Sequence, residues 1–220
     1  LDGTTVVEEI SAEGGAAIAT KTDISDPESN QEMVRLATEQ FGTIDVLVNN
    51  AAVLDLLSID QLDQKLWEQT LAINLTAPFV LSKSVLPSML TTGGSIINVS
   101  SRAGAAGFAN EAAYCSSKFG LEGLTRALAV ELSECGVSVN TITPGLKIKP
   151  TSITDIQAAE RSSDEQKVWN DPAQLVPAFV WLSCLRGEVS GQRFDAHVLS
   201  RALRAEGFDI SPDRAMQLAE

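Results

Sequence analysis

Residues 95–101 read Ser-Ile-Ile-Asn-Val-Ser-Ser, a short apolar stretch that ends in two hydroxyl side chains. Its length and its branched side chains predict a buried strand. Small residues at 112–132 predict a long helix, and residues 137–142 predict another strand. A strand, a helix and a strand in succession indicate a parallel sheet with helices on both faces. The hydroxyls would then lie at the carboxyl edge of the sheet, where open α/β sheets bind ligands.

The same alternation continues toward both ends of the chain. The further helices that we expect lie at residues 4–12, after the cap Ser25-Asp26-Pro27, at residues 63–90 and at residues 172–185. The further strands that we expect lie at residues 16–22, 44–48 and 191–196. Residues 144–170 are polar and lack periodicity, which predicts a mobile flap, and residues 198–220 predict a partly helical tail. The fold class that this pattern predicts is α/β, with a doubly wound parallel sheet.

The composition favours one soluble domain. The chain has 220 residues, of which 44% are hydrophobic, enough for one core. Its formal net charge of -13 repels nucleic-acid phosphates and anionic lipid. The longest apolar stretches are much shorter than a membrane-spanning helix. We therefore expect a partner that is neither nucleic acid nor membrane.

Cysteine and histidine are few and widely spaced. Cys115, Cys135 and Cys184 form no CxxC pair, which argues against a disulfide framework and favours a reducing cytoplasm. The single histidine, His197, excludes a multi-histidine metal site, and a catalytic role for it is the less favoured interpretation. We expect no metal.

Tyr114 and Lys118 stand four residues apart in the predicted helix, so both side chains project from one face. A phenol has a pKa near 10 and is a poor acid-base group at neutral pH, but a neighbouring ammonium lowers the cost of ionising it. A Tyr-x-x-x-Lys pair alone is more often a surface helix pair. Ser101, thirteen residues before Tyr114, could polarise a substrate oxygen at the sheet edge, or it could merely end a strand.

Amide side chains stand at two further positions of interest. The predicted strand at residues 44–48 runs into Asn49-Asn50-Ala51-Ala52, where small residues let a flat ligand approach and amides could bind a ribose hydroxyl. A simple turn is the alternative. Asn74 interrupts an otherwise helical stretch, and an exposed polar face is the alternative to a functional role there.

Together these residues resemble the motif set of the short-chain dehydrogenase/reductase family. The set consists of Asn49-Asn50-Ala51-Ala52, Asn74, Ser101, Tyr114-x-x-x-Lys118 and Asn140-x-x-x-Pro144-Gly145, in the family's order and spacing. The match runs from about residue 4 to residue 195. It implies a Rossmann-type domain at residues 1–197, with a tail at residues 198–220 that could lie at a subunit interface.

The resemblance also implies roles for single residues. Tyr114 would be the general acid-base, and Lys118 would lower its pKa and bind the nicotinamide ribose. Ser101 would orient the substrate oxygen, and Asn74 would hold a water that links Lys118 to solvent. The residues implied to contact the NAD or NADP cofactor are Asp23, Asn49, Ala51, Tyr114, Lys118, Pro144 and Gly145.

The sequence departs from the family pattern at both ends. The family opens with a strand and a Thr-Gly-x-x-x-Gly-x-Gly turn that binds the cofactor pyrophosphate, whereas this chain begins directly in a helical pattern. We therefore expect an N-terminally truncated sequence that lacks the first β-α-β unit. Two missing strands would open a gap of about 10–15 Å in the sheet, and the chain as written should bind NAD(P) poorly. Thr151 comes late for a nicotinamide contact, and Asp195-Ala196-His197 replaces the usual Asp-Gly-Gly.

The function that the resemblance implies is NAD(P)-dependent oxidation and reduction of a secondary alcohol and ketone, or of a 3-hydroxyacyl and 3-oxoacyl pair. One alternative is an epimerase or dehydratase on the same scaffold, although such relatives usually carry a larger C-terminal part. The other is a non-catalytic scaffold. Lys147 and Lys149 could attract an anionic substrate, but solvated lysines are the more common case. The small residues of the predicted helix at 112–132, together with the family, lead us to expect a homodimer or homotetramer.

Overall fold

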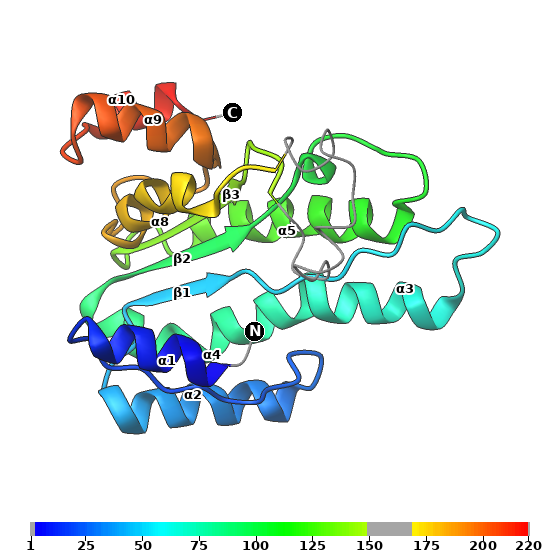
Figure 1. The fold of residues 1–220 in the computed structure, drawn as a ribbon, viewed down its shortest axis with the longest axis horizontal. Coiled ribbons are helices and arrows are strands. Elements are labelled where there is room, and N and C mark those ends of the chain that lie inside the picture. Colours follow the sequence, from blue (N-terminus) through cyan, green and yellow to red (C-terminus); the bar gives the residue numbers. More distant parts are fainter. Residues whose placement is uncertain (1–2, 149–168, 220) are drawn as a thin grey trace.

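The structure is a computed structural model, and it describes residues 3–148 and 169–219. Its centre is a parallel sheet in the order β1 to β4 (Figure 1). The strands are β1 (Val46–Asn49), β2 (Gly94–Val99), β3 (Val137–Thr143) and β4 (Arg193–Asp195). Because all four strands are parallel, their carboxyl ends meet at one edge of the sheet.

Helices cover both faces of the sheet, which confirms the predicted α/β class. The helices α2 (Pro27–Phe41), α4 (Ala77–Thr92) and α5 (Ala112–Glu131) pack against one face, and α8 (Val176–Ser183) and α9 (Ala196–Glu206) pack against the other (Figure 1). Successive residues of β2 point to opposite faces of the sheet and pack in two different hydrophobic clusters. Ile96 packs with Met89 of α4, whereas Ile97 packs with Leu182 of α8 and Leu199 of α9.

The remaining elements are short or lie at the ends of the chain: α1 (Gly3–Ala12), α3 (Gln64–Leu71) and α10 (Pro212–Gln217). Local sequence explains several boundaries. The carboxylate of Asp26 accepts hydrogen bonds from the first turn of α2, and Pro27 opens that helix, as the sequence predicts. α4 ends at Thr92 and is capped by Gly93, whose positive φ of 77° suits glycine.

The predicted strand at residues 16–22 is wrong. These residues are mostly exposed, and the structure gives them no strand assignment. A strand needs a neighbour that accepts and donates its backbone hydrogen bonds, and in the described sheet β1 pairs with β2 alone. β1 is therefore an edge strand, with Val48 45% exposed.

Two other predictions need adjustment. The helix predicted at residues 63–90 is divided into α3, a π-helical turn at Ala72–Thr76, and α4. The helix predicted at residues 172–185 begins with a 3₁₀ turn, Pro172–Leu175, before α8. Residue 197, where the sequence predicts a boundary between domain and tail, lies in α9, and that boundary stays a prediction. Of the flap predicted at residues 144–170, residues 149–168, and with them Lys149 and Thr151, lie outside the described part.

Candidate active site

Tyr114, Lys118 and Ser101 lie together at the carboxyl edge of the sheet. Tyr114 and Lys118 stand one turn apart on α5, with the Lys118 ammonium 5.6 Å from the centre of the tyrosine ring. Ser101 follows the end of β2, and its hydroxyl oxygen accepts a hydrogen bond of 3.2 Å from the Ala103 amide. Burial raises the pKa of the half-buried Tyr114 phenol, while a hydrogen bond with Ser101 lowers it.

The raised pKa of Tyr114 is opposite to the direction expected from the neighbouring Lys118. The largest cause is burial of the phenol, and the nearby lysine does not outweigh it. The lysine ammonium donates a 2.8 Å hydrogen bond to the carbonyl oxygen of Val99, and the side chain is only 3% exposed. Burial lowers the pKa of Lys118 to about 8, although the carboxylate of Glu122 acts in the opposite direction.

Asn74 is buried in the π-helical turn between α3 and α4. Its amide group donates to the carbonyl of Val53 at 2.9 Å and accepts from the amide of Val53 at 2.9 Å. The same side chain donates to the hydroxyl of Ser117 at 3.1 Å, and Ser117 lies between Tyr114 and Lys118 on α5. The exposed polar face that was the alternative for Asn74 is therefore wrong. A π-turn often marks a functional site, because it re-aims one side chain within a helix.

Asn49 ends β1, and its side chain amide donates to Asn98 of β2 at 2.8 Å. The Asn49 side-chain oxygen is buried, and no hydrogen-bond partner for it lies within residues 3–148 and 169–219. A buried acceptor of this kind is available to a ligand donor. Ala51 lies in the exposed loop that follows the strand.

A pocket of about 660 Å³ lies at the carboxyl ends of β3 and β4. Ser101, Pro144 and Gly145 line it, as do Lys147 and Asp195. Gly145 has φ of 67°, and a methyl group there would lie within 2.3 Å of the Asp195 carboxylate. Glycine at this position lets the backbone and the carboxylate approach closely.

Asp23 is placed differently from the other predicted cofactor residues. It is exposed in the loop before α2, and its carboxylate accepts hydrogen bonds from the amide and hydroxyl of Ser25. These bonds hold the pKa of Asp23 below its usual value. Among the described residues, no contact joins Asp23 to Ser101, Tyr114 or Lys118, so an adenine contact by Asp23 remains a prediction.

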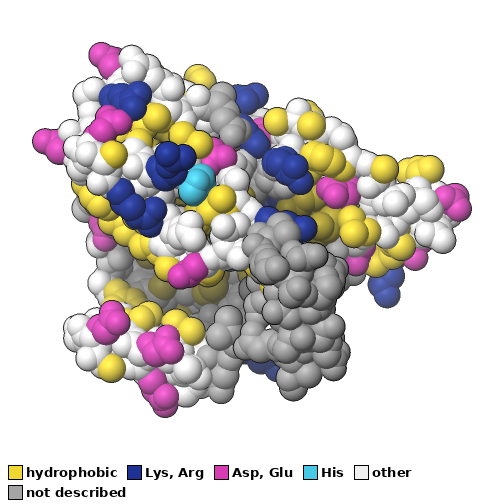
Figure 2. All heavy atoms as spheres, turned by 45° about the horizontal axis from the view of Figure 1, so that its top comes forward, with side chains coloured by type: hydrophobic (Ala, Val, Ile, Leu, Met, Phe, Trp, Pro, Cys, Tyr) yellow, Lys and Arg dark blue, Asp and Glu magenta, His cyan; other side chains and the backbone are white. Residues whose placement is uncertain are grey.

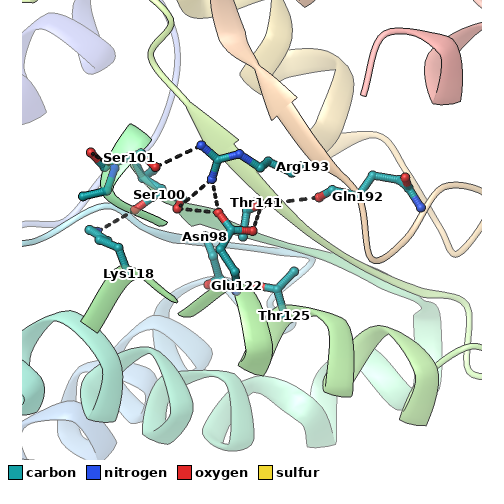
Figure 3. Close-up of polar contacts among 11 residues, drawn as sticks. Asn98, Ser100, Ser101, Lys118, Glu122, Thr125, Thr141, Gln192 and Arg193 are labelled. Atoms are coloured by element: carbon teal, nitrogen blue, oxygen red, sulfur yellow. Dashed lines mark hydrogen bonds and ion pairs between the residues drawn. The ribbon is translucent and has the colours of Figure 1, made fainter. Parts of the chain in front are cut away.

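Sequence reasoning missed a buried polar network beneath Ser101. Figure 3 shows the guanidinium of Arg193 lying between the carboxylate of Glu122 and the backbone of Ser101. Glu122 is one turn after Lys118, so the same helical spacing that relates Tyr114 and Lys118 could have pointed to it. Arg193 lies 71 residues after Glu122 and is brought there only by the order of the strands.

Comparison with known proteins identifies the class of protein. The family model described as short chain dehydrogenase matches residues 2–163, which is more than half of the chain. The chain therefore belongs to the short-chain dehydrogenase family.

Individual relatives agree with this assignment. The chain is 41% identical over 150 residues to trans-4-hydroxycyclohexanecarboxylate dehydrogenase of Sinomonas cyclohexanicum, an alignment that covers 66% of this chain and 58% of that protein. It thus spans about three fifths of the length of the first curated relatives it matches.

Solved structures show the same fold. A putative short-chain alcohol dehydrogenase from Sinorhizobium meliloti superposes with a TM-score of 0.78 at 25% identity, covering 88% of this chain and 79% of that chain. A putative NAD(P) dependent gluconate 5-dehydrogenase from Beutenbergia cavernae, with bound NADP at low occupancy, superposes with a TM-score of 0.75 at 32% identity, covering 89% and 82%.

Further findings concern the surface charges, the helices, the metal-binding side chains and the cysteines. On the face shown in Figure 2, basic side chains are interspersed with acidic ones, with no extended basic surface. Within residues 3–148 and 169–219, no helix has the length and apolar character needed to cross a bilayer. The same residues contain no cluster of metal-binding side chains, and all three cysteines are unpaired.

Proposed function

We propose that this chain carries the acid-base site of an NAD(P)-dependent oxidoreductase that interconverts a secondary alcohol and a ketone. The observation that carries the proposal is the meeting of Tyr114, Ser101 and the buried Lys118 at one sheet edge. Oxidation of an alcohol to a ketone removes one proton and one hydride. Bound NAD(P) would accept or supply the hydride, and the chain must therefore move the proton.

Tyr114 is the proposed proton donor and acceptor. In the reductive direction its phenol gives a proton to the carbonyl oxygen, and in the oxidative direction the phenolate takes the hydroxyl proton. Ser101 donates a hydrogen bond to the same substrate oxygen and stabilises the charge that develops there. Burial raises the pKa of Tyr114, so the phenol is protonated at neutral pH and has a proton to give, although the same shift makes it a weaker acid.

The described residues fit one half of the cofactor. The groups that could hold a nicotinamide and its ribose are the side-chain oxygen of Asn49, which has no partner among the described residues, the ammonium of Lys118 and the backbone at Pro144-Gly145. The sequence contains no glycine-rich turn of the kind that binds a pyrophosphate at a helix N-terminus. We therefore expect NAD or NADP to bind weakly to the chain as written.

The proposed substrate is a small alcohol or ketone, and the proposed assembly is a homodimer or homotetramer in the cytoplasm. The assembly is supported by apolar side chains that α4 and α5 leave exposed, among them Phe79 and Phe119 at 48% and 49% and Val130 at 78%.

The test compares this chain with a version extended at its N-terminus by the glycine-rich segment of the gluconate 5-dehydrogenase relative. NADPH fluorescence measures binding, and NADPH oxidation with a panel of cyclic and linear ketones measures turnover. We expect tighter binding and measurable turnover in the extended chain. Equally tight binding to both chains would refute the expected cofactor defect, and binding without turnover on any ketone would count against the oxidoreductase itself.

A further inference from the structure

A row of polar side chains crosses the whole sheet beneath α5. Asn49, Asn98, Thr141 and Arg193 are register partners on the four successive strands, so their side chains lie on one face. All four are at least nine-tenths buried. Their hydrogen bonds run through α5, because Asn98 donates to Thr125 and Thr141 donates to Glu122, each at 2.8 Å.

The row ends in a buried ion pair. Arg193 contacts the Glu122 carboxylate through one guanidinium nitrogen, and the two side chains are 7% and 5% exposed. The carboxylate also accepts hydrogen bonds from the hydroxyls of Ser100, at 2.5 Å, and Thr141. Glu122 therefore has its charge and both of its oxygens satisfied, which the burial of a carboxylate requires.

The second guanidinium nitrogen of Arg193 reaches the site. It donates a 2.9 Å hydrogen bond to the carbonyl oxygen of Ser101 (Figure 3). Arg193 stands on β4, two strands away from β2, so it spans β3 to reach this carbonyl. The main chain of Ser101 is thus held from one side by Arg193, and its hydroxyl is held from the other by the Ala103 amide.

Stability alone is a weak explanation for this pair. A buried ion pair is often no more stabilising than well-packed apolar residues of the same volume, because both charges must leave water. What an apolar pair could not supply is a donor for the Ser101 carbonyl. A planar guanidinium presents donors in two directions, so one side chain can bind Glu122 and Ser101 together.

We propose that Arg193 and Glu122 are positioning residues that fix Ser101 so that its hydroxyl stays in contact with Tyr114. This inference deepens the proposed function and rests on it, because that function gives Ser101 and Tyr114 their roles. Glu122 orients Arg193 and Arg193 holds the Ser101 backbone. The Ser101 hydroxyl in turn acts on the Tyr114 phenol and lowers its pKa. The other titratable groups beside the phenol are Glu111, Cys115 and Lys118. Glu111 and Cys115 lie outside the network, whereas Lys118 has the Glu122 carboxylate as a neighbour.

The test uses the fact that Tyr114 is the single tyrosine in the sequence. Incorporation of a fluorinated tyrosine, which titrates nearer neutrality, lets ¹⁹F NMR report the pKa of this one phenol in the chain as it stands. The variants are Arg193→Lys, Ser101→Ala and the double variant. Lysine keeps the charge opposite Glu122 but has no second donor group to span to Ser101. Arg126→Lys, at an exposed position on α5, is the matched control.

We expect Arg193→Lys and Ser101→Ala each to raise the Tyr114 pKa by about 0.5–1 unit, the size of one lost hydrogen bond. The double variant should rise no further than Ser101→Ala, because both changes remove the same contact. Arg126→Lys should leave the value unchanged. If Arg193→Lys does not fold, the neutral pair Glu122→Gln with Arg193→Met removes the same donor and should give the same rise.

An unchanged pKa in the Arg193 variants, or shifts that add in the double variant, would overturn the proposal. The readout needs neither cofactor nor turnover. If the Arg193 variants leave the Tyr114 pKa unchanged, the proposed oxidoreductase activity is not affected by that result. If the enzyme proves inactive, the effect of Arg193 on the Tyr114 pKa can still be measured.

Discussion

The ammonium of Lys118 donates a hydrogen bond to the carbonyl oxygen of Val99, the last residue of β2, at 2.8 Å. The lysine side chain that makes this bond is buried at the edge of the sheet. A cation held there by a neutral carbonyl is harder to maintain than one in solvent, and burial accordingly lowers the Lys118 pKa to about 8. The protein thus holds a cation beside Tyr114 at a cost to its stability.

That cost should be visible in the pH dependence of unfolding. Between the folded pKa of Lys118 and the higher pKa of an unfolded lysine, the unfolded chain binds more protons, so stability rises with pH. From about pH 7 to pH 10, we expect the free energy of unfolding to rise by about 2 kcal/mol relative to Lys118→Met. Urea unfolding of both proteins across this range measures it.

The exposed lysine Lys83 on α4 provides the control for this measurement. Lys83→Met should follow the wild-type curve. If Lys118→Met also follows the wild-type curve, the buried cation carries no such cost.

Substitution of Asn74 should loosen the loop that follows β1. Asn74→Ala removes both hydrogen bonds to the Val53 backbone, and we expect it to lower the free energy of unfolding by about 2 kcal/mol. The amide of Val53 should also exchange its hydrogen faster in this variant, as measured by NMR. Asn50→Ala, at an exposed position in the same loop, should change stability by less than about 0.5 kcal/mol. Equal effects of the two alanines would contradict the role of Asn74 in holding this loop.

Local patterns in the sequence predict most of the helices and strands. The wrong predictions concern features that depend on contacts between distant parts of the chain. The cap Asp26-Pro27 marks the start of α2 correctly because it acts within one turn of the helix. Residues 16–22 have the composition of a strand, but a strand exists only beside a partner, and the sequence of one segment does not show whether that partner is present.

In the candidate active site, too, local spacing is predictable from the sequence and contacts between distant residues are not. Tyr114 and Lys118 share a helix face by spacing alone, so the sequence brings them together correctly. The low helix propensity of asparagine indicates that Asn74 is unusual within the predicted helix. The π-turn around it, however, depends on the hydrogen bonds of Asn74 to Val53 and Ser117. Arg193 joins the site only through the register of β2, β3 and β4, which no local pattern contains.

Substitution of Gly145 tests the close approach between its backbone and the Asp195 carboxylate at the pocket. In Gly145→Ala the new methyl group would displace the Asp195 carboxylate, which also caps α9 through the amide of Val198. Gly207→Ala is the matched control, because Gly207 also has a positive φ but has no heavy atom near its Cβ position. We expect Gly145→Ala to destabilise the protein by about 1 kcal/mol more than Gly207→Ala, the usual value of a helix cap. Thermal unfolding decides this, and equal losses would show that Asp195 moves aside freely.

The most direct test of the account is the rate of NADPH-dependent ketone reduction by Tyr114→Phe in the N-terminally extended chain. Phenylalanine keeps the ring and removes the proton donor. We expect the rate to fall by at least about 100-fold, the usual contribution of a general acid, while NADPH binding changes little. A Tyr114→Phe protein that reduces ketones as fast as the unsubstituted chain would contradict the assignment of Tyr114 as the acid-base residue.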